Sequence, residues 1–176
     1  DYPFVLNAGR IRDQWHTMTR TGLTPRLLAH ISEPFVEMHP RDAAAQGLRD
    51  GELARLNTRW GEMLARVQTN SGQLARTVFV PMHWTGALSS QGRVGPLVNP
   101  VTDPLSGQPE NKHTPVAVVP WQPAWQGFWL HLEATDLPAT DYAVTIRGEN
   151  GWRHELAGAE SADLQALADT WLPLND

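Results

Sequence analysis

Cysteine is absent from the 176-residue sequence. This absence excludes disulfides, iron–sulfur clusters held by thiolates, cysteine nucleophiles and cysteine-rich zinc sites within the chain. Long hydrophobic runs are absent too, since no apolar stretch approaches the ~20 residues that a membrane-spanning helix requires. The lack of cysteine fits a reducing compartment, and the lack of apolar runs gives no reason to expect a membrane-spanning segment.

The common catalytic signatures are also missing. The sequence has no glycine-rich phosphate loop ending in Lys-Ser/Thr, no G-x-G-x-x-G fingerprint, no H-E-x-x-H and no G-x-S-x-G elbow. Its seven histidines are scattered without the pairing of metal ligands. We therefore predict no catalytic residue and no metal ligand in this chain.

Size and composition indicate an ordinary globular domain. The chain is 41% hydrophobic and 19% charged, and 176 residues leave little room for a second core. A net charge of −5 gives no reason to expect nucleic acid or an anionic membrane as partner. The sequence begins without methionine inside an apolar run, so we expect a domain of a longer protein.

A local excess of positive charge follows the first apolar run. Arg10, Arg12, Arg20 and Arg26 face a single acid, Asp13, in the segment from residue 10 to residue 30. Arginine forks and backbone N–H groups after a glycine suit phosphate groups. The neighbouring tryptophan and histidine offer flat, half-polar surfaces for a heterocycle. Without further information, a solvated arginine edge with the tryptophan as core anchor explains this segment about as well.

The residue order of this segment carries a family resemblance. Residues 7–22 read Asn-Ala-Gly-Arg-Ile-Arg-Asp-Gln-Trp-His-Thr-Met-Thr-Arg-Thr-Gly. This segment resembles the opening of the C-terminal molybdopterin-dinucleotide-binding domain of the dimethyl-sulfoxide-reductase family, and is most similar to the assimilatory nitrate reductases. Ala8 stands where that family usually has threonine. The similarity continues through Gln108-Pro109-Glu110 to about Val119, over roughly the first two thirds of the chain.

The resemblance implies a set of cofactor contacts. They come from the first loop, from an amide in a later loop and from a lysine before the last barrel strand: Ala8, Gly9, Arg10, Ile11, Arg12, Asp13, Gln14, Trp15, His16, Thr17, Gln91 and Lys112. Backbone N–H groups of residues 8–10 and the side chains of Arg10, Gln14, His16 and Thr17 would meet one pterin and its pyrophosphate. Met82 and His83 would border the substrate funnel.

Other readings of three of these residues stay open. A lone lysine before a strand is usually a solvated charge, which would also explain Lys112. His83 either faces the substrate funnel or closes the end of a strand. His16 could be an ordinary histidine satisfied by its own loop.

The pattern of the first 120 residues is mainly β. Strands are expected at 4–6, 35–39, 52–57, 63–67, 77–82 and 116–119, with a short helix after Pro40. Short strands joined by tight turns favour a closed barrel. The resemblance implies that this barrel is a six-stranded double-psi β-barrel.

Two segments depart from this pattern. Residues 85–115 are rich in glycine and proline and lack any helix or strand period, so we expect a binding loop at the barrel mouth. Residues 121–176 read as a small α+β extension with strands near 128–130, 142–146 and 152–156 and a final helix after Ser161. We expect a barrel domain over 1–120 and an interdomain contact from 121–176.

Taken with the resemblance, the sequence predicts one domain of a cytoplasmic assimilatory nitrate reductase. The implied cofactor is molybdenum bis(molybdopterin guanine dinucleotide), and the implied partners are the N-terminal domains of the same enzyme. The metal ligand and an iron–sulfur cluster would lie in those domains. Two alternatives remain: another molybdopterin enzyme such as a formate dehydrogenase, and a stand-alone barrel that binds a protein partner without cofactor.

Overall fold

The computed structural model describes residues 2–131, 145–148 and 151–158. In chain order the elements are β1 Phe4–Gly9, η1 His16–Met18, η2 Thr21–Leu23, α1 Pro25–Leu28, β2 Phe35–Met38, α2 Pro40–Ala45, β3 Leu53–Asn57, β4 Glu62–Thr69, β5 Thr77–Pro81, η3 Gly95–Leu97, β6 Thr114–Pro120, β7 Trp125–His131, β8 Thr145–Gly148 and β9 Gly151–Gly158. Among the described residues, no helix has the length and apolar character needed to span a bilayer.

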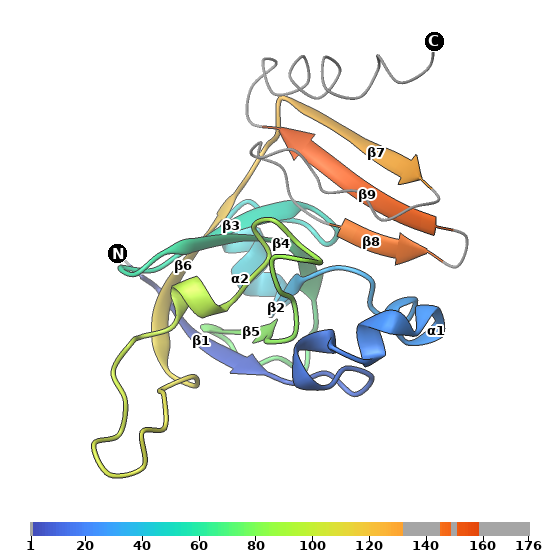
Figure 1. Cartoon of the computed structure of the whole chain (residues 1–176). Helices are drawn as coiled ribbons and strands as arrows, with labels where there is room; N and C mark the ends of the chain where they lie inside the picture. The colour runs from blue at the N-terminus through green and yellow to red at the C-terminus, as the bar shows by residue number, and fades with distance from the viewer. Residues whose placement is uncertain (1, 132–144, 149–150, 159–176) are drawn as a thin grey trace.

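Six strands close into a barrel in the order β1-β5-β2-β4-β3-β6 (Figure 1). Two pairs are parallel, β1 with β5 and β2 with β4, and the other four are antiparallel. Closure removes the free strand edges that an open sheet would expose. The expected class, a mainly β chain with a closed six-stranded barrel and short helices, is confirmed.

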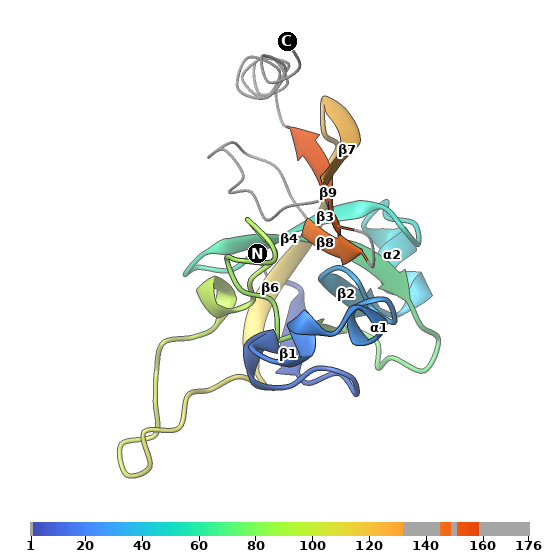
Figure 2. The ribbon, with the colours of Figure 1, turned by 45° about the vertical axis from the view of Figure 1, so that its right-hand side comes forward.

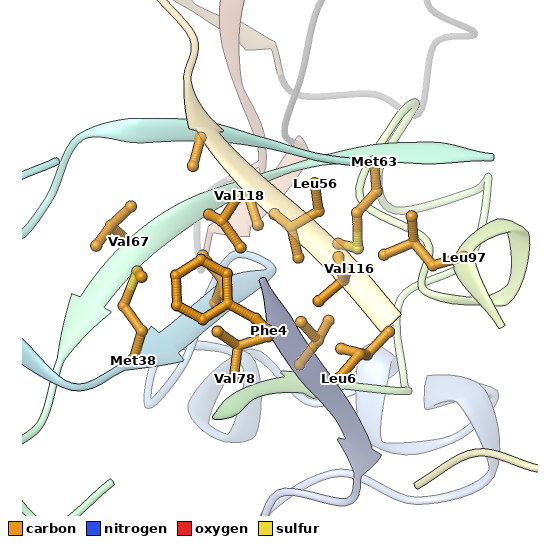
Figure 3. Packing of buried hydrophobic residues seen from close by; sticks show 14 of the residues in the cluster. Phe4, Leu6, Met38, Leu56, Met63, Val67, Val78, Leu97, Val116 and Val118 are labelled. Atoms are coloured by element: carbon orange, nitrogen blue, oxygen red, sulfur yellow. The ribbon is translucent and has the colours of Figure 1, made fainter. Parts of the chain in front are cut away.

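The barrel interior is filled by alternate residues of the strands (Figure 3). Phe4 and Leu6 on β1, Met38 on β2 and Val116 and Val118 on β6 are each at most 4% exposed. Burying a valine, leucine, methionine or phenylalanine side chain contributes roughly 1.5–3 kcal/mol. The strand alternation seen in the sequence is therefore the pattern of core packing, and it holds the strand ends in fixed positions.

The predicted helix after Pro40 is α2, and it crosses from β2 to β3. Pro40 occupies its first turn, and the His39 ring accepts a hydrogen bond from the Arg41 backbone N–H at 3.1 Å. Gly47 follows the helix with φ +72°, a conformation that glycine adopts without strain. This end of β2 lies opposite the barrel end described below, because β2 runs antiparallel to β5.

A second, three-stranded sheet follows the barrel in the order β7-β9-β8, and β8 contacts α1 (Figure 1). The strands expected near 128–130 and 152–156 correspond to β7 and β9. The third expected strand is described only from Thr145 onward, as β8. The helix expected after Ser161 lies outside the described residues.

Candidate functional site

One end of the barrel brings together three segments that are distant in the sequence. β1 and β5 are parallel, with Gly9 paired to Pro81, so both strands finish at this end. β6 is antiparallel to β1, with Leu6 paired to Thr114, so β6 begins there. The loop after β1, the loop after β5 and the loop before β6 therefore share this end, which we call the barrel mouth.

The loop before β6 is bonded directly to the end of β1. The backbone N–H of Ala8 donates to the carbonyl of Asn111 at 2.9 Å. The Lys112 ammonium donates to the carbonyl of Ala8 in return. Lys112 is the single lysine of the sequence, and this contact orders it against β1. The Ala8 side chain, 1% exposed, belongs to the barrel core, so its backbone and side chain are all engaged within the fold.

The loop after β5 holds the same strand end from the other side. The Met82 N–H donates to the carbonyl of Gly9 at 2.9 Å. The Ile11 N–H donates to Nε2 of His83 at 3.1 Å. We call the bonded segments 8–11, 82–83 and 111–112 the strand-end clamp. It fixes the position from which residues 10–30, which we call the cationic loop, leave the barrel.

His83 is buried, with 2% of its surface exposed. Burial lowers the pKa of its imidazole, and the positive charge of Arg10 lowers it further. The ring is therefore neutral near pH 7, as an acceptor of the Ile11 N–H must be. Of the two open readings, the structure favours a residue that closes the end of β5 and bonds the loop after β1.

The four arginines of the loop from residue 10 to residue 30 are all exposed. Arg12 is paired with Asp13 at 2.9 Å, and the same carboxylate bonds the His30 ring at 2.8 Å. The Arg12 bond and then the His30 bond lower the pKa of Asp13 to about 2. Over the part of the chain that is described, Arg10, Arg20 and Arg26 form no ion pair, so the loop keeps the positive charge that the sequence predicts.

Exposed rings accompany these charges. Trp15 is 55% exposed and therefore not a core anchor. The Arg10 guanidinium lies 5.2 Å from the centre of the Trp15 ring, and the His16 ring meets Trp15 edge-on at 5.2 Å. A guanidinium over an indole face is a favourable pairing. Together these side chains form a cationic, aromatic surface open to solvent.

The backbone of this loop takes a rare turn at η1. His16, Thr17 and Met18 have φ values of 42°, 52° and 63°, three successive left-handed residues without a glycine. Each costs roughly 1–2 kcal/mol relative to the right-handed form. Buried contacts of Met18 with Leu28 and Trp84 form a small second core that holds the turn. The turn leaves His16 and Thr17 at the surface.

Gln14 has a different environment from its neighbours. It is 2% exposed, and its amide oxygen accepts a hydrogen bond from the Thr21 hydroxyl at 2.7 Å. Its amide nitrogen reaches the Leu27 carbonyl at 3.4 Å. Both ends of this amide are thus used inside the loop, a supporting role that the spacing of polar residues did not reveal.

The loop before β6 projects from the barrel in both views (Figures 1 and 2). A cleft of about 690 Å³ separates it from Met82, with Lys112 on the wall. The Asp103 carboxylate accepts hydrogen bonds from the backbone N–H groups of Leu105 and Ser106, which gives the tip a defined turn. Met82 and Lys112, predicted from distant motifs, therefore border one cleft.

Gln91 lies at the same barrel end but on another part of the rim. Its carbonyl accepts the N–H of Leu64 near the start of β4. In the barrel order, β5 and β2 separate β4 from β1. The cationic loop and the cleft are thus linked through the strand-end clamp, whereas Gln91 borders the mouth at a different strand.

Sequence reasoning missed several residues that build this site. Asn111 bonds β1 through its backbone carbonyl, a contact that no side-chain signal marks. The Thr21 hydroxyl donates a hydrogen bond to the Gln14 amide oxygen. The Phe79 ring packs against Gly9 so closely that a Cβ at Gly9 would lie 2.6 Å from the ring. The glycine of the motif thus leaves room for the Phe79 ring of β5 to lie against β1.

This donor set fits a large anionic ligand with ring systems rather than a bare metal ion. Three arginines without an ion pair among the described residues and two exposed rings lie on the cationic loop, which the strand-end clamp links to the cleft lined by Lys112. Over the described residues there is no group of three or more histidine, aspartate or glutamate side chains that could hold a metal. Fold and site together define a barrel domain that binds a phosphate-bearing organic cofactor.

Comparison with known proteins identifies the family to which this barrel domain belongs. Residues 4–115 match the family model of the molydopterin dinucleotide binding domain, and the chain belongs to that family. A nitrate reductase of Klebsiella oxytoca is 53% identical over 139 residues, which cover 79% of this chain and 16% of that protein. The F420-dependent formate dehydrogenase subunit alpha of Methanocaldococcus jannaschii is 35% identical over 112 residues, covering 64% of this chain and 16% of that protein.

A solved structure shares the fold. The acetylene hydratase of Pelobacter acetylenicus superimposes with a TM-score of 0.56 at 19% identity, over 66% of this chain and 18% of that one. The chain thus spans less than a fifth of the length of the proteins to which it is similar. The predicted family and fold class are confirmed.

Proposed function

We propose that the barrel mouth holds the phosphate groups and one pterin edge of a molybdopterin guanine dinucleotide. The observation that carries this proposal is the convergence of the cationic loop, Met82 and Lys112 at one end of the barrel, through the strand-end clamp. Convergence of this kind supports a single shared site. In this proposal Arg10, Arg20 and Arg26 supply positive charge, and Trp15 and His16 supply flat surfaces.

Hydrogen bonds to an ionised phosphate are each worth roughly 1.5–3 kcal/mol net. Several exposed arginines therefore matter more than any one of them. Thr17, Ile11 and Gln91 would border the cofactor, while Arg12 and Asp13 would set the charge of the loop. Gln14 would act by holding the loop in shape. The Lys112 ammonium has two N–H donors beyond the one given to Ala8, and these would face the cleft.

The whole protein, in our proposal, is a cytoplasmic assimilatory nitrate reductase. The bound molybdenum bis(molybdopterin guanine dinucleotide) supplies the two-electron chemistry that reduces nitrate to nitrite. This chain supplies position and charge, and Met82 borders the substrate funnel. The N-terminal domains of the same enzyme would carry the metal ligand and an iron–sulfur cluster. The barrel would comprise residues 1–120, and residues 121–176 would form an extension that contacts another domain.

A formate dehydrogenase is the second candidate function, since a subunit of one is similar over 64% of this chain. The greater identity to a nitrate reductase favours nitrate. Purified enzyme assayed with reduced viologen and nitrate, and separately with formate and an electron acceptor, separates the two candidates. If the enzyme turned over formate but not nitrate, formate would be its substrate, and the proposed cofactor site would be unaffected.

The cofactor site is tested by the double variant Arg10→Ala, His16→Ala in the full-length enzyme. We expect reduced molybdenum content per protein, measured by mass spectrometry of the metal, with normal thermal unfolding of the barrel. The matched control is Arg49→Ala, His39→Asn at the opposite barrel end, where Arg49 is 86% exposed and asparagine keeps a helix cap. Normal molybdenum content in the first variant, or equal loss in the control, would refute the site.

A further inference from the structure

His83 is the one titratable side chain in the strand-end clamp whose charge changes near neutral pH. The other three bonds of the clamp use backbone carbonyls, with backbone N–H groups or the lysine ammonium as donors. Those bonds survive a change from pH 8 to pH 5. The Ile11–His83 bond does not, since Nε2 accepts a hydrogen bond only when it carries no proton.

The geometry also fixes the tautomer of His83. Nε2 faces the Ile11 N–H at 3.1 Å, so the neutral ring carries its proton on Nδ1. Protonation would place an N–H on Nε2 against the N–H of Ile11, donor against donor. The ring is 2% exposed, so water has little access to replace the lost partner. Protonation of this ring therefore opens the contact.

The charges around His83 oppose protonation. Arg10, in the loop after β1, lowers the pKa of His83 in addition to the effect of burial. Lys112 reaches the same strand end from the β6 side, through Ala8. β5 itself, Thr77–Pro81, contains no charged residue. Arg10 is thus the cation that acts on the ring, and no carboxylate among the described residues bonds the ring.

Because Arg10 and Ile11 are adjacent, the hydrogen bond between Ile11 and His83 fixes the backbone position from which the Arg10 side chain extends into solvent. We propose that His83 is a positioning residue, which holds the first turn of the cationic loop through Ile11 and releases it on protonation. This inference rests on the proposed function, because the loop it positions is the proposed cofactor-binding segment. Its consequence is that cofactor retention weakens as the pH falls.

The direction of the pH effect on the Ile11–His83 hydrogen bond follows from the lowered pKa of His83. The bond is intact above the ordinary histidine value near 6.5 and is lost as the pH falls through the lower value of the folded protein. The test is hydrogen exchange with mass spectrometry on the full-length enzyme between pH 8 and pH 5. Rates in the peptide containing Ile11 are corrected for the intrinsic pH dependence of exchange and compared with a β4 peptide.

Three variants separate positioning from general stability. His83→Gln places an acceptor oxygen near Nε2 without a titratable ring, so we expect wild-type protection at pH 8 and no loss at pH 5. His83→Leu removes the acceptor, and we expect roughly five-fold faster exchange of Ile11 at pH 8, as for one lost hydrogen bond. His39→Leu is the matched control, since it removes a ring that accepts a backbone N–H at the opposite barrel end. It should leave Ile11 unchanged.

Molybdenum release from the same samples gives the functional measurement. We expect release to accelerate at pH 5 in the wild-type enzyme and to stay constant with pH in His83→Gln. A wild-type Ile11 peptide with constant protection from pH 8 to pH 5 would overturn the inference, as would equal pH dependence in His83→Gln. If His83→Leu fails to fold, the comparison of wild type with His83→Gln still decides. If the purified wild-type enzyme contained no molybdenum, the proposed function would be overturned instead. The hydrogen-exchange data would still test whether protonation of His83 releases Ile11.

Discussion

Replacing Gly9 by alanine tests the close contact between Gly9 on β1 and the Phe79 ring on β5. A Cβ at this position would lie 2.6 Å from Cε2 of Phe79, about 0.8 Å short of ordinary van der Waals contact. The centre of the Phe79 ring lies 6.0 Å from the centre of the Phe35 ring, so a second ring limits its movement on one side. Either the ring or the strand must shift, and a shift of the strand would strain the bond from the Met82 N–H to the Gly9 carbonyl.

The expected magnitude combines two opposing effects. Overpacking of this kind costs about 1–3 kcal/mol. Alanine also restricts the unfolded chain, which returns about 0.4–1 kcal/mol. The net loss is about 1–2 kcal/mol, and a urea slope of about 2 kcal/mol/M converts it to a midpoint lower by roughly 0.5–1 M. The eight tryptophans of the chain report unfolding by fluorescence.

Two further variants locate the cause of the loss. Gly95→Ala is the matched control, because a Cβ at Gly95 meets nothing within 4 Å. It should change the midpoint little. In a Phe79→Leu background, Gly9→Ala should lower the free energy of unfolding much less, because the ring edge that the new Cβ would meet is absent. An equal cost of Gly9→Ala in both backgrounds would show that Phe79 is not the obstacle and would refute this account of the motif glycine.

Two further predictions concern the cationic loop. Thr21→Val leaves the buried oxygen of Gln14 without its 2.7 Å partner, so we expect about 1–3 kcal/mol of destabilisation by urea unfolding; a change below 0.5 kcal/mol would contradict the supporting role of Gln14. Asp13→Asn removes a carboxylate whose pKa is lowered to about 2. The stabilisation that this carboxylate gives is present above its unfolded pKa near 3.8 and is lost as the pH falls toward 2. The stability difference between wild type and Asp13→Asn should therefore narrow between pH 4 and pH 2 in acid titrations, and a constant difference would argue against the Arg12 and His30 pairs.

The strands of the barrel were accessible from the sequence because their signals are local. Alternating apolar residues mark β4, and Pro40 and Gly47 bound α2, as predicted. Strand order is different, since β1 pairs with β5 and β6 rather than with its neighbour in sequence. Short strands joined by tight turns favoured a closed barrel, and the family resemblance supplied its six-stranded double-psi type. Composition and periodicity alone do not encode these long-range pairings.

The site was predictable in outline and not in its contacts. The cationic character of the loop follows from residue types, whereas the exposure of Trp15 was left open by the sequence and is given by the structure. The left-handed turn at His16–Met18 does not, because residues other than glycine adopt it only when tertiary contacts impose it. The burial of Gln14 and the bond from Ile11 to His83 likewise depend on which loops share the mouth.

The most direct test is an experimental structure of the full-length enzyme with its cofactor, by crystallography or electron cryomicroscopy. We expect dinucleotide phosphates within hydrogen-bonding distance of the loop that begins at Arg10, and a pterin edge in the cleft between Met82 and Lys112. Phosphates bound instead at the opposite barrel end, near Arg49, would contradict it.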